Sequence, residues 1–277
     1  MKTAVGAVRR IDRSLRKYLR TRGIVGTFVV VLTHPYFWLR KREARKTDDL
    51  IQAREREFDV AFGVETATFA KLADLDIPSK SWVFGNNYAA TPPALFEEML
   101  GSLDIRCEDF VFVDFGSGKG RTLLLASRMP FKQVIGVEFS PELHEVAVRN
   151  IRSLAREDLA CADVRSVLAD AAEFDLPSDP LVCYFFNPFS ADIMSCVLSN
   201  IRRSLEAVPR KTYVVYLHRA LRGYMVEGGS GESSFTSVFD GTGFLSPVTV
   251  GPQYCVYESV PVSQPAVSGE GAGVGSR

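Results

Sequence analysis

A short glycine-rich stretch offers the clearest chemistry in this sequence of 277 residues. It reads DFGSGKG, from Asp114 to Gly120, directly after the strand-like apolar run FVFVDF at Phe110–Phe115. Glycine lets the backbone turn tightly and approach a ligand closely. Free N–H groups at the start of a following helix suit a negative group, and Asp114 can pair with a positive one. The stretch therefore predicts a cofactor-binding loop, for which three kinds of cofactor compete.

Two familiar phosphate-binding motifs fit this loop poorly. The nucleoside-triphosphate loop G-x-x-x-x-G-K-[ST] requires Ser or Thr after the lysine, but Gly120 follows Lys119, and Val113 stands where the first glycine should be. The dinucleotide motif G-x-G-x-x-G requires a small third residue, where this chain has Arg121. An arginine there would obstruct close packing of helix on strand. The first interpretation fails and the second is weakened.

A third pattern, D-x-G-x-G-x-G, is matched at every position by Asp114, Gly116, Gly118 and Gly120. It resembles the first motif of the seven-β-strand (class I) S-adenosylmethionine-dependent methyltransferases. The resemblance implies that the loop, Ser117 included, binds the amino-acid end of S-adenosylmethionine. Its glycines would let the backbone pass close to the cofactor, and Asp114 would hold the cofactor's ammonium group directly or through water.

Two further acids follow in the order that this resemblance requires. Glu138 ends the next apolar run, VIGVE, 24 residues after Asp114, where a carboxylate can accept hydrogen bonds from both ribose hydroxyls. Dinucleotide enzymes use an acid similarly placed, so Glu138 alone does not discriminate. Asp170 follows the third run, within VLADAAEF, where the class commonly binds the adenine amino group. Together with the glycine motif, the two acids favour S-adenosylmethionine.

The sequence YFFNPF ends a fourth apolar run, at the point where this class places its methyl-transfer site. Amine-methylating members often carry [D/N/S]-P-P-[Y/F], and this chain has Asn187, Pro188 and Phe189, with one proline fewer. The Asn187 carbonyl could accept a hydrogen bond from a substrate amine and aim the lone pair of the amine nitrogen at the methyl carbon. Pro188 would stiffen the turn, and Phe189 would give an apolar or cation–π wall. The alternative is a turn beside the cofactor with no catalytic part.

The upstream sequence indicates a branch of the class. Tyr88 and Thr91, in YAATPP, precede the first strand, and DFGSGKGR follows. Over about residues 85–190 this arrangement distantly resembles the mitochondrial protein lysine methyltransferases, which implies that Tyr88 and Thr91 help to close over the cofactor. The stretches FDVAFGVETA, PALFEEML and PFKQVIGVEFSPELHEVAVRN more closely resemble uncharacterised bacterial class I methyltransferases. The hypothesis is N-methylation, with protein lysine as one acceptor; a small-molecule O- or N-methyltransferase and a non-catalytic binding module are the alternatives.

The elements that must position these residues alternate between strand and helix, which predicts an α/β, doubly wound and mostly parallel sheet. Two late β-runs joined by the turn GPQ add an antiparallel C-terminal hairpin, so that seven strands are expected. The expected strands are 110–115, 134–138, 164–168, 181–186, 212–217, 244–250 and 254–260, and the expected helices are 93–103, 121–128, 141–155 and 191–205. Residues 59–93 are predicted to be irregular. Ser140 before Pro141 is a good helix N-cap.

Charge and composition divide the chain into parts. Residues 1–60 contain 15 Lys and Arg against 7 Asp and Glu, whereas the remainder contains 18 against 26. The predicted domains are a basic helical arm (1–58), a class I methyltransferase domain (59–262) and a disordered Ser/Gly/Pro-rich tail (263–277). Residues 228–234, GGSGESS, predict a flexible loop.

The arm suggests an acidic partner. A helix over 5–20 has a basic face, so that residues 1–40 could contact a membrane surface, or the helix could pack on the domain; nucleic acid is a less favoured partner. The 17-residue apolar stretch 23–39 is at the lower limit for a membrane span, and a docked or interfacial segment is preferred. Five cysteines without C-x-x-C spacing and three separated histidines predict no metal site and a reducing compartment. The expected location is cytoplasmic, with peripheral membrane association left open.

Overall fold

The computed structural model describes residues 53–70, 86, 88–217, 238–239, 242–251 and 253–261. Apart from Ala53, they all belong to one compact unit, Arg54–Arg277. The predicted features at 5–20, 23–39, 228–234 and 263–277 lie outside the described residues, so the membrane-surface arm and the disordered tail stay predictions. No helix in the described ranges combines the length and the apolar character needed to cross a membrane.

A seven-stranded sheet forms the centre of the unit, in the order β3-β2-β1-β4-β5-β7-β6. Strands β1 to β5 pair in parallel, whereas β7 is antiparallel to both β5 and β6. The predicted mostly parallel sheet with an antiparallel C-terminal hairpin is confirmed. The strands are β1 Val111–Phe115, β2 Gln133–Glu138, β3 Val164–Leu168, β4 Leu181–Phe186, β5 Thr212–Leu217, β6 Leu245–Val250 and β7 Tyr254–Ser259.

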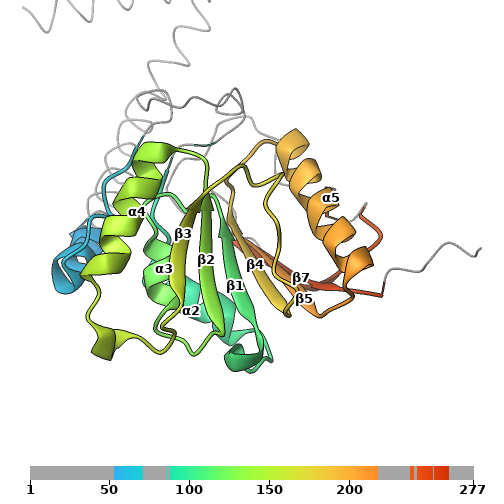
Figure 1. The fold of residues 1–277 in the computed structure, drawn as a ribbon, viewed down its shortest axis with the longest axis horizontal. Coiled ribbons are helices and arrows are strands. Elements are labelled where there is room, and N and C mark those ends of the chain that lie inside the picture. Colours follow the sequence, from blue (N-terminus) through green and yellow to red (C-terminus); the bar gives the residue numbers. More distant parts are fainter. Residues whose placement is uncertain are drawn as a thin grey trace, which may run out of the picture. The chain divides into compact units, whose positions relative to one another are not determined.

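Helices cover both faces of the sheet, as expected for a parallel sheet joined by crossovers. Figure 1 shows α5 across one face, with α2 and α3 behind the strands. The helices are α2 Pro93–Gly101, α3 Arg121–Ala126, α4 Pro141–Ser153 and α5 Ala191–Ala207, with 3₁₀ turns η3 Cys107–Asp109 and η4 Arg156–Asp158. The predicted cap is confirmed, because the Ser140 hydroxyl accepts a hydrogen bond from the Leu143 N–H at 3.4 Å at the start of α4.

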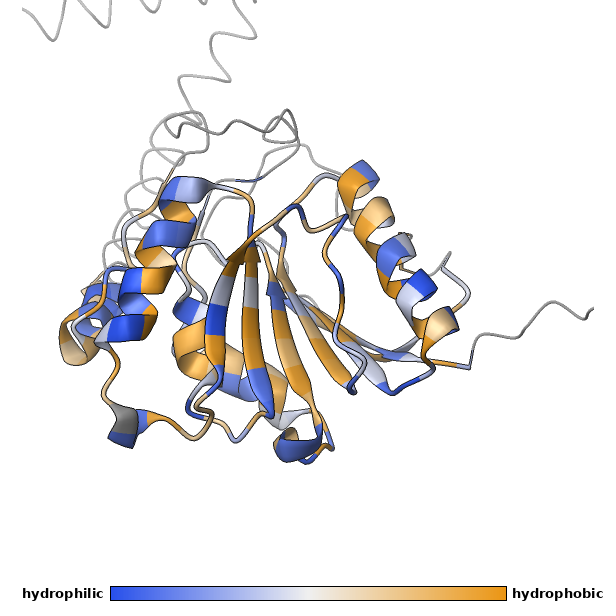
Figure 2. Cartoon of the chain, in the orientation of Figure 1, coloured by the Kyte–Doolittle hydropathy of each residue, from blue (hydrophilic) through white to orange (hydrophobic). Residues whose placement is uncertain are grey.

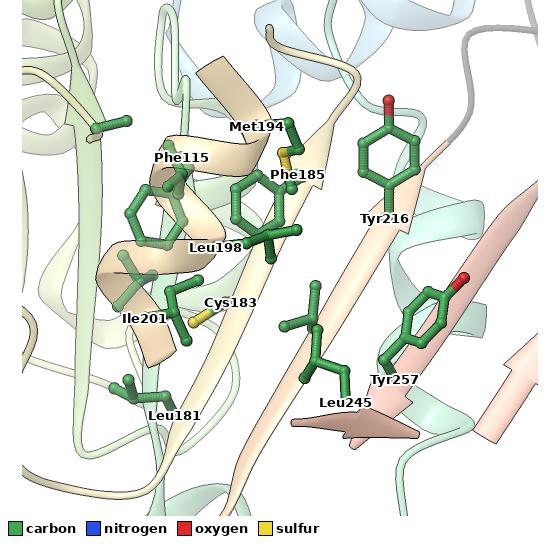
Figure 3. Close-up of a cluster of buried hydrophobic side chains, with 14 of the residues drawn as sticks. Phe115, Leu181, Cys183, Phe185, Met194, Leu198, Ile201, Tyr216, Leu245 and Tyr257 are labelled. Carbon is green, nitrogen blue, oxygen red and sulfur yellow. The ribbon is translucent and has the colours of Figure 1, made fainter. Parts of the chain in front are cut away.

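The central strands are mainly apolar because both of their faces are covered. Along β1, Val111, Val113 and Phe115 join the cluster under α5, while Phe112 joins the cluster under α2 and α3. Figure 2 shows the apolar residues along these strands and polar residues on the outer sides of α4 and α5. We call the residues under α5 the α5-face cluster. Figure 3 labels Phe115, Leu181, Cys183, Phe185, Met194, Leu198, Ile201, Tyr216, Leu245 and Tyr257 within it.

One element differs from the prediction. Residues 59–93 were expected to be irregular, but residues 53–62 form a helix that crosses the expected boundary at residue 58. The helix ends at Gly63, whose φ of 64° is left-handed, and the Val64 N–H donates to the Asp59 carbonyl at 3.0 Å. This is a glycine-terminated helix end, since glycine takes the left-handed conformation without steric cost. The helix therefore continues into the unit that contains the sheet.

Candidate functional site

The predicted site residues gather where β1 and β4 lie next to each other. The chain moves from β1 outward to β2 and β3, then returns to add β4 on the other side of β1. Such a switch point leaves a crevice at the carboxyl ends of the strands, where open α/β sheets bind ligands. Asp114 pairs with Gly136 of β2 and with Tyr184 of β4 in the sheet register, so the glycine loop begins at this point.

The glycine loop needs its glycines for two physical reasons. Gly116, Gly118 and Gly120 have φ values of 86°, 53° and 83°, a region that other residues enter at a cost of about 1–2 kcal/mol. A Cβ atom on Gly116 would lie 2.7 Å from Cβ of Pro188, and one on Gly118 would overlap the Tyr88 ring. The loop is therefore held between the segment before α2 and the loop after β4.

Asp114 is buried at the end of β1, with 3% of its surface exposed. The Thr122 hydroxyl donates to its Oδ2 atom. Burial raises the pKa of Asp114 to about 7; the Thr122 hydrogen bond opposes this shift and the charge of Glu138 adds to it. A buried carboxylate with a raised pKa is favourably placed to pair with a cationic group, because such a group would compensate the cost of burying the charge.

Glu138 joins the loops that follow β1 and β2. Its Oε2 accepts from the Gly118 N–H at 2.7 Å and its Oε1 from the Ser140 N–H at 2.9 Å. Burial raises its pKa to about 7, and hydrogen bonds from the backbone N–H groups of Ser140, Gly118 and Phe139 oppose that shift. In this structure the side chain fixes the glycine loop, and its contact with a ribose stays a prediction.

Asp170 lies at the same edge of the sheet, beside the end of β2. The Ala169 N–H donates to the Glu138 carbonyl at 3.0 Å, which aligns the loop after β3 with Glu138. Asp170 itself is half-buried, and its Oδ1 accepts from the Ala172 N–H at 2.9 Å. The carboxylate therefore shapes its own turn, next to the position where the sequence predicted adenine.

The loop after β4 contains a strained asparagine. Asn187 has a φ of 40°, the only positive φ among the described residues other than glycine. Its Oδ1 accepts a hydrogen bond from the Tyr216 hydroxyl at 2.9 Å. Figure 3 shows that hydroxyl pointing away from Leu245 and Tyr257, towards the end of β5. Backbone strain of this kind is concentrated at functional sites, and here the carboxamide reaches Tyr216 of β5, the strand that follows β4 in the sheet.

The two residues that follow Asn187 face the glycine loop and the core. Pro188 lies against Gly116, as described above, and its carbonyl accepts from the Asn86 N–H at 2.9 Å. Phe189 is 6% exposed and belongs to the α5-face cluster. Its ring is therefore largely part of the core, which leaves little of it to form the predicted wall.

Tyr88 and Thr91 cover the glycine loop from the segment before α2. The Tyr88 hydroxyl donates to the Thr66 carbonyl at 2.8 Å, and the Thr91 and Tyr184 hydroxyls are hydrogen-bonded at 2.9 Å. A small cavity of about 20 Å³ touches Tyr88, Thr91, Asp114, Gly116 and Ser117 together. Five predicted residues, from the two segments 88–91 and 114–117, thus line one space.

The Ser117 side chain is turned towards the sheet. A Cβ atom on Gly136 of β2 would lie 2.6 Å from Ser117 Oγ, so the two residues are in close contact. That oxygen is buried and has no hydrogen-bond partner in the described part of the chain. Position 117 therefore has room only for a small side chain, and the Ser117 hydroxyl points towards β2.

The sequence interpretation missed a polar network on the outer side of the loop. Arg121 is 1% exposed and contacts Asp59 and Thr66, and Lys119 pairs with Glu65 at 2.7 Å. The signal available in the sequence was a pair of basic residues, K-x-R, beside the glycines of the loop. No group of three or more His, Cys, Asp or Glu residues in the described ranges could hold a metal ion.

Residues 112–207, from β1 to the end of α5, match the family model described as a methyltransferase domain. This segment resembles methyltransferase domains. It contains the glycine loop, both buried carboxylates and the strained Asn187, whereas Tyr88 and Thr91 precede it. No curated protein sequence matches the chain.

Solved structures that resemble the chain include methyltransferases. Magnesium protoporphyrin IX methyltransferase of Synechocystis PCC 6803, with bound SAM, is 14% identical, with a TM-score of 0.39 over 61% of this chain and 77% of that one. An RNA methyltransferase of Salinibacter ruber, in complex with S-adenosyl-L-homocysteine, is 19% identical, with a TM-score of 0.39 over 64% and 97%. These likenesses are remote, and the resemblance to methyltransferases rests on the family match over residues 112–207.

Proposed function

We propose that this chain transfers a methyl group from S-adenosylmethionine to an acceptor nitrogen, with protein lysine as the first acceptor class to test. The observation that carries the proposal is the glycine loop of the methyltransferase domain, which lies between two buried carboxylates at the switch point of the sheet. The bound cofactor supplies an activated sulfonium methyl group. The protein then has to bind, orient and desolvate the two reactants.

The residues of the loop fit this cofactor. Three glycines with positive φ give a backbone that a ligand can approach closely. Asp114 has a pKa raised to about 7 by burial, and a cationic ammonium group would favour its charged form. Glu138 and Asp170, on the neighbouring strand ends, would hold the ribose hydroxyls and the adenine amino group.

The support for a nitrogen acceptor comes from Asn187. Its Oδ1 already accepts one hydrogen bond, from Tyr216, and an amide oxygen has two lone pairs. A substrate N–H can take the second lone pair, which would hold the nitrogen with its own lone pair directed away from Asn187. An acceptor without an N–H or O–H donor could not use this contact. The lysine class rests on the resemblance of Tyr88, Thr91 and the glycine motif to protein lysine methyltransferases.

Isothermal calorimetry with S-adenosylhomocysteine tests the cofactor. We expect binding to the wild-type protein, and weaker binding to both Asp114→Ala and Glu138→Ala. Glu258→Ala is a matched control, because that carboxylate pairs with Lys211 at 3.1 Å on β7, outside the site. If the folded wild-type protein failed to bind at near-millimolar ligand, the proposal would be wrong.

Transfer of a tritiated methyl group into fractionated cell lysate tests the acceptor. Acid-stable label in protein, recovered as methylated lysine after hydrolysis, is the expected result. Label recovered only in small metabolites would contradict the lysine class and favour a small-molecule methyltransferase. Cofactor binding without transfer into any fraction would favour a binding module.

A further inference from the structure

The segment before α2 docks on the glycine loop through Asp59, at the end of the helix 53–62. Four donors converge on its two carboxylate oxygens. Oδ2 accepts from the Thr66 N–H at 2.7 Å and from the Ala67 N–H at 2.6 Å. Oδ1 accepts from the Thr66 hydroxyl at 2.6 Å and from Arg121 Nη2 at 3.2 Å. One carboxylate thus fixes the backbone at 66–67 and connects it to the first residue of α3.

Arg121 completes this connection from the side of the methyltransferase domain. Its Nε donates to the Thr66 hydroxyl, and its Nη2 donates to the Glu55 carbonyl at 3.2 Å as well as to Asp59. Its guanidinium also lies 4.1 Å from the centre of the Phe58 ring. The planar guanidinium supplies several donors in fixed directions, so a lysine could not reproduce these contacts. Burial of this charge directly beside the glycine loop is costly unless the segment stays in place.

A second point of attachment is Lys119, within the glycine loop. Lys119 Nζ donates to Glu65 Oε1 at 2.7 Å. Asn150 of α4 accepts from the Glu65 N–H at 2.9 Å and donates through Nδ2 to the carbonyls of Glu65 and Lys119, at 3.1 and 2.8 Å. The segment is therefore fixed on both sides of Thr66, by residues within or next to the glycine loop.

Thr66 transmits this attachment to the cofactor side. Its carbonyl accepts the hydrogen bond of the Tyr88 hydroxyl at 2.8 Å, and the Tyr88 ring lies directly against Gly118. Thr66 is 0% exposed and Tyr88 is 8% exposed, so solvent does not compete strongly for this contact. A continuous series of contacts runs from Arg121 and Asp59 through Thr66 to Tyr88 and Gly118.

We propose that Asp59 and Arg121 are positioning residues of the cofactor site, which hold Tyr88 against Gly118 and so fix the glycine loop before the cofactor binds. The inference rests on the proposed cofactor. A loop of glycines has many conformations, and restricting them in advance lowers the entropy cost of binding. Neither Asp59 nor Arg121 has to contact the cofactor for this effect.

Calorimetry with S-adenosylhomocysteine on the full chain tests the series of contacts. Asp59→Asn replaces one carboxylate oxygen by an NH₂ group. A single acceptor oxygen then remains for the four donors, so we expect about tenfold weaker binding. Tyr88→Phe keeps the ring on Gly118 but removes its link to Thr66, and we expect a loss of similar size. Because both variants break one series, the Asp59→Asn/Tyr88→Phe double variant should bind about as weakly as either single variant.

Asp179→Asn is the matched control. That carboxylate pairs with Lys132 near the opposite ends of the strands, so Asp179→Asn removes an exposed ion pair away from the site and should leave the affinity unchanged. Circular dichroism identifies variants that fail to fold. If Asp59→Asn does not fold, the affinity of Tyr88→Phe for S-adenosylhomocysteine still tests the inference. Unchanged affinity in Tyr88→Phe, or multiplicative losses in the double variant, would overturn the inference. If the wild-type protein did not bind, the proposed function would fail instead.

Discussion

The two halves of the candidate site are built in different ways. The cofactor half, Asp114–Gly120 with Glu138, consists of backbone turns, left-handed glycines and buried carboxylates. The acceptor half, Asn187–Phe189 with Tyr216, consists of one strained residue and one side-chain hydrogen bond beside an apolar core. The first half is specified by backbone geometry that few other residues could adopt. The second half depends on a few side chains, which are compatible with more than one acceptor.

The largest effect is expected from a substitution in the cofactor half. Gly118→Ala would force a Cβ atom into the Tyr88 ring at a φ of 53°, and we expect at least about 100-fold weaker binding of S-adenosylhomocysteine, measured by calorimetry. The control Gly243→Ala separates the cost of a positive φ from the steric overlap with a neighbouring side chain. Gly243 also has a positive φ, of 68°, but nothing lies within 4 Å of the position of its Cβ. This control should lose about 1 kcal/mol of unfolding free energy and keep its affinity. Equal affinities in the two variants would mean that the loop does not contact the cofactor.

A smaller effect is expected in the acceptor half. Tyr216→Phe removes the donor to Asn187 Oδ1, so the carboxamide loses its fixed orientation. Burial raises the pKa of Tyr216, which keeps the hydroxyl protonated as a donor at neutral pH. We expect methyl transfer into lysate to fall about tenfold, while affinity for S-adenosylhomocysteine stays within about twofold.

The control for Tyr216 is Tyr257→Phe, in the same α5-face cluster but on β7. It should lower stability without a selective loss of transfer. A parallel fall of binding and transfer in Tyr216→Phe would mean that the two halves are not separable. In that case Tyr216 would support the whole edge of the sheet rather than the acceptor position.

The same contrast explains what the sequence could predict. The runs FVFVDF and LVCYFF are apolar because both faces of β1 and β4 are covered, so these strands were found to within one residue. The glycine motif was found because positive φ restricts the residue type. Local patterns of this kind can be recognised in a single sequence, because each element restricts the residue types of its own segment.

Contacts between distant segments were not predictable. Asp59 and Arg121 are 62 positions apart, and Tyr216 and Asn187 are 29 apart, so no local pattern joins them. The pattern TYVVYL is typical of a buried strand. It gives no indication that the Tyr216 hydroxyl, near the end of β5, forms a hydrogen bond with Asn187. The predicted boundary at residue 58 falls inside the helix 53–62, because the charged sequence before it resembles the basic arm. Gly63 is the residue at which the helix ends.

The smallest expected effect concerns pH and the charge of the cofactor half. Burial raises the pKa of Glu138 and of Asp114 to about 7, so both carboxyls are largely protonated in the free protein below that pH. The carboxylate forms are the better acceptors for ribose hydroxyls and for an ammonium group. We therefore expect the affinity for S-adenosylhomocysteine to rise severalfold between pH 6 and pH 8, because protons are released on binding.

Isosteric variants assign this pH dependence. Glu138→Gln should bind more weakly at pH 8 and should show a shallower rise, and Glu138→Gln with Asp114→Asn should remove most of it. Protein stability should change in the opposite sense, because a raised pKa in the folded state means that stability is lost as pH rises from about 4 to about 7. Affinity that fell with rising pH would show that the cofactor half binds its ligand through neutral carboxyl groups, and the charge complementarity assigned to Asp114 would then be wrong.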